Sequence, residues 1–304
     1  MTLRPLTAEV DTKDSPVRRF LDERFTFGLR EVQRHYRQAA PSLVLPSASH
    51  QDANPSTVGT AADWLLRFLL HPKPSLALAA RGAVICGMDR PFREIAESLG
   101  YVADSNVAMT GTDGFIGPAS GNLGEPEDLA RACWVLALLT EAYRRPMAMV
   151  NGPLSGFTGR RVPGSTLLAL APSAGLTQLA GFRSVFETDL VPKLALHPGR
   201  WYLGPTFAGS ALMKADADLI TAGLLLDLKT DSKFSLGVAV MFQVIGYALL
   251  DFDDAYRLTE LGIFRARYAH LTTWNLSTLL DELAGHSVTL SAIRQEFRAL
   301  LSRF

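Results

Sequence analysis

Residues 212–230 read LMKADADLITAGLLLDLKT, and this stretch decides the fold. Residues 212–220 alternate between apolar and charged side chains, and residues 224–230 form a leucine-rich run with one Asp and one Lys. Both patterns are typical of β-strands. Between them lies Thr221-Ala222-Gly223, a short turn that contains a glycine. The stretch therefore predicts a β-hairpin in which Ala222 and Gly223 are the loop residues.

Four charged side chains of this hairpin are expected to converge. A two-residue loop places Asp218 opposite Asp227, and Asp216 opposite Lys229. Directly opposed residues share a face of the sheet, with Cβ atoms about 4.5–5.5 Å apart. Alternation along each strand puts both pairs on the same face. A bulge at the turn would shift this register by one residue, so the pairing is a hypothesis.

Three carboxylates on one face repel each other, and a divalent cation would offset that repulsion. Such a cation makes water a better nucleophile and stabilises the leaving oxygen. Lys229 would then orient the attacking water or neutralise the transition state. The alternative is an ordinary charged hairpin edge that faces solvent. The second strand is too apolar for such an edge, since it contains Leu224, Leu225, Leu226 and Leu228, and this favours the metal site.

These residues resemble the second and third strands of the PD-(D/E)XK phosphodiesterase superfamily. In that pattern, an Asp ends one strand and a (D/E)-x-K triplet lies on the next. Asp218 matches the first acid, and Asp227-Leu228-Lys229 matches the triplet.

A second motif lies in the helix expected over residues 235–250. Gln243 and Tyr247 are four residues apart and share a helix face. They are similar to the QxxxY motif of the exonuclease-like branch of the superfamily. The alternative is two polar residues satisfied inside a buried helix. From residue 173 onward the expected order is αβββαβ, which is also the order of the superfamily core. The resemblance covers about residues 173–275 and implies an α/β fold with a central mixed sheet flanked by helices.

The resemblance also implies a metal site. Asp218 and Asp227 would bind Mg²⁺ or Mn²⁺, with the backbone carbonyl of Leu228 as a further ligand. Some members of the superfamily add an acid from the helix before the first strand, and Glu187 is the candidate for that position here.

The remaining site residues would act on the substrate. By the same resemblance, Lys229 would assist the attacking water, and Gln243 and Tyr247 would hold the lysine or the scissile phosphate. Asp216 is outside the usual pattern. It would be a spare ligand, or the first acid if the register slips.

The N-terminal half carries helical patterns over residues 21–39, 60–70 and 125–143. Residues 151–164 are rich in Gly, Pro and Arg and suggest an internal boundary. The sequence thus predicts a mainly α-helical region over residues 1–160 and a nuclease-like core with C-terminal helices over residues 161–304. No family resemblance covers the first region. Its expected roles are to gate the site, to bind a partner protein or to build a homo-oligomer.

The charge, cysteine content and hydropathy of the chain bear on which classes of protein it can belong to. Lys plus Arg and Asp plus Glu both number 30 in the 304 residues, so the formal charge is zero. This counts against a protein that coats nucleic acid through bulk charge, although a local basic groove is compatible with it. Two cysteines form no CxxC pair, and the N-terminus lacks a secretory apolar region. The uncharged residues 162–182 and 234–250 contain breakers or polar groups, so no membrane span and a cytoplasmic location are expected.

Other charged groups are expected to be solvated. These are the acidic run over residues 251–254 and three basic residues that could touch phosphate, Lys233, Arg265 and Arg267. Six histidines show no paired metal-ligand spacing.

The expected function is a Mg²⁺-dependent nuclease acting on DNA rather than RNA, and roles in defence or repair are both compatible with it. Two alternatives remain open. One is a catalytically silent nucleic-acid-binding or scaffold protein on the same fold, and the other is a hydrolase of small phosphorylated molecules.

Overall fold

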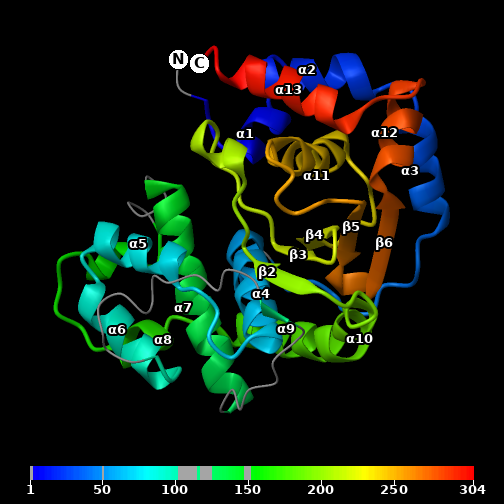
Figure 1. Cartoon of the computed structure of the whole chain (residues 1–304). Coiled ribbons are helices and arrows are strands. Elements are labelled where there is room, and N and C mark those ends of the chain that lie inside the picture. Colours follow the sequence, from blue (N-terminus) through cyan, green and yellow to red (C-terminus); the bar gives the residue numbers. More distant parts are fainter. Residues whose placement is uncertain (1–2, 50, 102–114, 117–124, 147–151) are drawn as a thin grey trace. The chain divides into compact units, whose positions relative to one another are not determined.

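The computed structural model describes residues 3–49, 51–101, 115–116, 125–146 and 152–304 (Figure 1). The chain forms two compact units. The first comprises Met1–Ser42, His197–Leu228 and Lys233–Phe304, and the second comprises Leu43–Leu196 and Lys229–Ser232. The expected boundary between residues 160 and 161 therefore falls inside the second unit, and the first 42 residues join the C-terminal half.

The first unit is built on five strands: β2 (Arg200–Leu203), β3 (Leu219–Thr221), β4 (Leu224–Lys229), β5 (Glu260–Arg265) and β6 (His270–Asn275). The last residue of β4, Lys229, is grouped with the second unit. They are neighbours in that order. The pairs β2/β3, β3/β4 and β5/β6 are antiparallel. Because the sheet is mixed, β4 and β5 run parallel. Helix α11 (Val238–Leu250) makes the crossover that a parallel pair requires. The expected α/β class with a mixed central sheet is confirmed.

The β3–β4 hairpin has the expected register. Leu219 pairs with Leu226 and Thr221 pairs with Leu224, which leaves Ala222 and Gly223 as the loop. Both loop residues have positive φ, +45° and +84°. Two consecutive positive φ angles define a type I′ turn, whose twist matches that of the strands it joins.

The first strand of the hairpin is shorter than the sequence predicts. β3 contains only three residues, and Asp216 instead forms an isolated antiparallel bridge with Thr206. The expected pairing of Asp216 with Lys229 is therefore absent from the ladder. On its other side, the segment before β3 continues its pairing with residues 204–206, through the Gly204 N–H to the Asp218 carbonyl and the Thr206–Asp216 bridge.

Gly223→Ala is expected to destabilise the hairpin. The positive φ alone costs a residue with a Cβ atom about 1–2 kcal/mol. In addition, that Cβ would lie 2.8 Å from Thr259 Oγ1 and 2.9 Å from the carbonyl oxygen of Arg257. Gly237→Ala is the matched control because a Cβ there meets nothing within 4 Å. Urea unfolding should show a loss above 2 kcal/mol for Gly223→Ala only, by these magnitudes. Equal losses in both variants would contradict this account of the turn.

The first unit also contains six α-helices, of which α11 and α12 contact the sheet. They are α1 (Leu6–Asp11), α2 (Pro16–Phe25), α3 (Leu29–Gln38), α11, α12 (Leu276–Ala284) and α13 (Leu290–Leu301). α1 packs on α11, α2 packs on α12 and α13, and α3 packs on α12. Figure 1 shows the blue N-terminal helices beside the red C-terminal ones. Their apolar faces form one buried cluster, which explains why the N-terminus belongs to this unit.

One expected helix of this region is divided in two. The pattern over residues 21–39 breaks at Gly28, where a Cβ atom would lie 2.1 Å from the carbonyl oxygen of Glu282. Only a glycine permits this close approach of the α2–α3 connection to α12.

The second unit is mainly helical. Its elements are α4 (Pro55–Leu70), α5 (Ala77–Cys86), α6 (Asp89–Ser98), the two-residue strand β1 (Phe115–Ile116), α7 (Pro126–Arg144), α8 (Gly164–Leu168), α9 (Ser173–Val185) and α10 (Val191–Leu194). α7 packs against α4, α5 and α9, so it is the central helix. The helices expected over residues 60–70 and 125–143 are confirmed. Of the connection expected over residues 151–164, Asn151 lies outside the described residues. No helix in the described ranges is long and apolar enough to span a bilayer.

Candidate active site

The hairpin and α11 bring four of the expected site residues together. Asp218 directly precedes β3, and Asp227 lies in β4. Oδ2 of Asp218 accepts a hydrogen bond from the backbone N–H of Leu228 at 2.7 Å. The Asp218 carboxylate therefore lies against the peptide that follows Asp227, which places the two acids side by side.

Gln243 links this acid pair to α11. Its Nε2 lies 3.2 Å from Oδ1 of Asp227 and 2.8 Å from the hydroxyl oxygen of Tyr247. An amide nitrogen carries two hydrogens, so one group can serve both acceptors. The spacing of four residues places Gln243 and Tyr247 on one helix face, as the sequence predicts. Gln243 thus fixes the carboxylate of Asp227 relative to the helix.

Two of the site residues are buried, whereas Asp218 and Gln243 are half-buried. Asp227 is 2% exposed and Tyr247 is 5% exposed. Burial raises the pKa of Tyr247 well above its ordinary value, and the negative charges of Asp227, Asp216 and Asp218 raise it further. Three carboxylates therefore lie within electrostatic reach of one phenol, which stays protonated at physiological pH. A cation would relieve the mutual repulsion of these acids.

The donor atoms suit a hard cation. Asp218 and Asp227 offer carboxylate oxygens, and the carbonyl of Leu228 follows Asp227 directly in β4. Mg²⁺ commonly takes one or two carboxylates and completes its shell with water and phosphate oxygens. Among the residues that the structure describes, no three His, Cys, Asp or Glu side chains gather as a metal-holding group. The candidate set is thus two side chains and one backbone carbonyl.

Lys229 is the last residue of β4 and is half-buried. Because side chains alternate along a strand, it projects from the same face as Asp227. The geometry of β4 therefore directs one ammonium group and one carboxylate to one side of the sheet.

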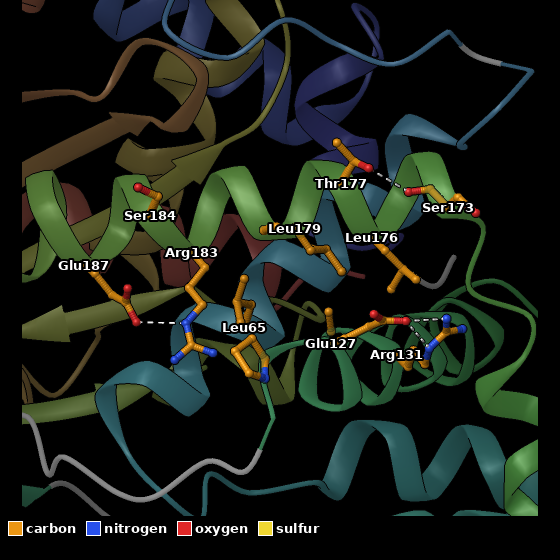
Figure 2. A pocket seen from close by; sticks show the side chains of 13 residues that line it. Leu65, Glu127, Arg131, Ser173, Leu176, Thr177, Leu179, Arg183, Ser184 and Glu187 are labelled. Atoms are coloured by element: carbon orange, nitrogen blue, oxygen red, sulfur yellow. Dashed lines mark hydrogen bonds and ion pairs between the residues drawn. The ribbon is translucent and has the colours of Figure 1, made fainter.

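Glu187 belongs to the second unit, whereas the acid pair belongs to the first. It belongs to a π-helical segment (Phe186–Leu190) that follows α9 in the second unit. Its Oε1 accepts a hydrogen bond from Nε of Arg183 at 2.9 Å. Both side chains line a cavity of about 620 Å³ between α4, α7 and α9, which Figure 2 shows. The structure gives Glu187 an ion-pair partner there, in a unit that does not contain the acid pair.

Two groups expected to be solvated are buried instead. Arg265 and Arg267 are only 1% and 4% exposed. In the acidic run over residues 251–254, Asp251 is fully buried and lies 3.1 Å from Nη2 of Arg294. The sequence does not reveal these contacts, because the partners come from distant segments. The alternation of Arg265 with Leu261 and Ile263 along β5 is the one local sign that Arg265 is buried.

Comparisons with protein-family models, with curated proteins and with solved structures found no match for this chain.

Proposed function

We propose that this protein is a metal-dependent nuclease with a PD-(D/E)XK core that hydrolyses phosphodiester bonds in DNA. The observation that carries the proposal is the chain of contacts from Asp218 through the Leu228 peptide and Asp227 to Gln243 and Tyr247. Along the chain, α9 and α10 of the second unit are followed by β2, β3, β4, α11 and β5, and this βββαβ part matches the corresponding part of the superfamily's αβββαβ order.

Each residue has a distinct role in this proposal. Asp218, Asp227 and the carbonyl of Leu228 would hold Mg²⁺ or Mn²⁺, which supplies an activated water and neutralises charge on the phosphate. The ammonium group of Lys229 would orient the attacking water and stabilise the negative charge that develops in the transition state. Gln243 would act as a positioning residue, since it holds Asp227 in one orientation.

The test is cleavage of labelled single- and double-stranded DNA by the full chain, with and without Mg²⁺ or Mn²⁺. Wild type should cut only with metal. Lys229→Met should be slower by about 100-fold or more, the usual effect of removing one charge-stabilising donor. Lys13→Met is the control because Lys13 is exposed on the connection between α1 and α2.

The outcomes separate the alternatives. A folded wild type that binds Mn²⁺ by calorimetry but cuts neither DNA nor RNA would favour a silent binding protein. A folded wild type that neither binds Mn²⁺ nor cuts would contradict the proposed function.

A further inference from the structure

Five rings form a chain of contacts that runs along β6 and includes the β5–β6 turn, the segment after β4 and α3. The ring of Phe234 stacks on Tyr36 with centroids 4.7 Å apart and an interplanar angle of 18°. Tyr268 and His270 meet Phe234 edge-on, at 5.0 and 5.5 Å. Trp274 stacks on Tyr36 at 6.1 Å. We call Phe234, Tyr268, His270 and Trp274 the aromatic platform, with Tyr36 as its base.

The platform is partly open to solvent, whereas its base is not. All four platform residues are half-buried, and Tyr36 is only 3% exposed. Aromatic rings that keep part of their surface exposed offer π-surface to a flat ligand.

A buried arginine holds the platform in place. Nε of Arg265 donates to the hydroxyl of Tyr36 at 2.9 Å. Its two terminal nitrogens donate to the carbonyls of Lys233 and Ser235, the residues on either side of Phe234. The guanidinium group thus fixes both the base ring and the backbone that carries Phe234. Such preorganisation lowers the entropy lost when a ligand binds.

The platform and the acid pair lie on the same face of the sheet. Leu225 and Ile263 belong to one apolar cluster, so they mark that face on β4 and β5. Asp227 alternates with Leu225, and Arg265 alternates with Ile263. His270 is the cross-strand partner of Arg265 and shares its face.

The two groups are also close to each other along the strands. β4 and β5 start level, because the amide groups of Thr259 and Glu260 both donate to the carbonyl of Gly223. His270 lies two strands away from Asp227 and two residues further along the strand direction. Together these offsets give a distance of about 12 Å between the two residues. A polynucleotide with a phosphate at the acid pair could therefore lay a neighbouring base on the platform.

We infer that the aromatic platform binds unpaired bases, so that the substrate is single-stranded nucleic acid. This inference rests on the proposed function for the identity of the ligand. In a duplex the base faces are stacked and hidden, whereas single strands offer them to aromatic side chains. The formal charge of zero gives the chain little bulk attraction for phosphates, so stacking has to supply a larger share of the affinity. Lys233, exposed next to Phe234, provides a local cation for the backbone.

The test is fluorescence anisotropy of the full chain in EDTA, where no cleavage occurs. The probes are a short labelled thymidine oligonucleotide, the same strand with abasic sites, and a duplex. Wild type should bind the thymidine strand more tightly than the abasic strand, by roughly 5- to 150-fold for one or more stacked bases. Phe234→Leu and Tyr268→Leu keep apolar volume and should each remove most of this preference. Phe27→Leu is the control, since Phe27 is 81% exposed and lies in the connection between α2 and α3, outside the platform.

Tryptophan emission gives a second readout. Trp64, Trp134 and Trp201 are buried, whereas Trp274 is half-exposed in the platform. The thymidine strand should therefore quench the emission of wild type, and Trp274→Phe should remove that response.

The inference would be overturned by equal affinity for thymidine and abasic strands, by tighter binding of duplex, or by an equal loss in Phe27→Leu. Binding does not depend on cleavage, so the two proposals can fail separately. A preference for bases without any cleavage would support the platform and contradict the nuclease. Cleavage that is unaffected by Phe234→Leu and Tyr268→Leu would support the nuclease and contradict the platform.

Discussion

Asp227→Asn is expected to abolish metal-dependent cleavage, with a loss of about 1,000-fold or more, because it removes one of the two side-chain ligands. Asparagine has nearly the same shape as aspartate and keeps an Oδ1 atom that can accept from Gln243, now 3.2 Å away. The substitution therefore changes charge with little change in packing. A single-turnover cleavage assay with Mg²⁺ measures the effect.

The same variant should stay folded and lose its response to metal. Asp227 is 2% exposed, and burying a carboxylate costs more free energy than burying an amide of the same shape. Without metal, the melting temperature of Asp227→Asn should equal or exceed that of wild type. With Mg²⁺ at 100 times its dissociation constant, wild type should gain about 2.7 kcal/mol and the variant should gain almost none.

Asp253→Asn is the matched control, because Asp253 is an exposed acid in the same unit. Its activity and its response to metal should equal those of wild type. An Asp227→Asn variant that still cuts DNA, or that melts well below wild type without metal, would show that the acid pair is structural.

The candidate site could be predicted because its signals are local. The loop Ala222-Gly223 sets the register of the hairpin, and that register places Asp218 beside Asp227. The spacing of Gln243 and Tyr247 sets their common helix face. None of these relations needs knowledge of distant parts of the chain.

The division into units and the aromatic platform depend on long-range packing, which local sequence patterns do not predict. The first 42 residues join the C-terminal half because α1, α2 and α3 cover α11, α12 and α13. The aromatic platform combines Phe234 with rings from the β5–β6 turn and from β6, and its base comes from α3. The crossover from β4 to β5 brings Phe234 to this hairpin, and the docking of α3 on α12 brings Tyr36, and a spacing rule cannot anticipate either.

Arg294→Met is expected to lower the free energy of unfolding by about 3–5 kcal/mol, the usual cost of leaving one buried charge without its partner. Arg294 is 5% exposed and donates to the carbonyl of Ala248 at 3.0 Å and to Asp251 at 3.1 Å. Asp251 is fully buried and also accepts from the backbone N–H groups of Ala255 and Tyr256. The network joins the end of α11 to α13, so its loss weakens the helix that carries Gln243. Arg298→Met, an exposed change one turn further along α13, should cost little.

The pH dependence of this loss identifies its cause. Burial raises the pKa of Asp251 above its ordinary value of 3.8, and the positive charge of Arg294 opposes that rise. A carboxyl with a raised pKa in the folded state contributes stability that is complete below the unfolded value and is lost as pH rises through the folded value. Without Arg294 the folded pKa rises further, so the variant loses more stability than wild type between pH 4 and neutrality. The difference in unfolding free energy between Arg294→Met and wild type should therefore shrink as the pH falls toward 4, as measured by urea unfolding at each pH.

Adding Asp251→Asn to Arg294→Met should recover part of the lost stability and remove this pH dependence, because no buried carboxylate remains. A difference that does not change with pH would instead mean that Arg294 stabilises the fold through packing and its bond to Ala248.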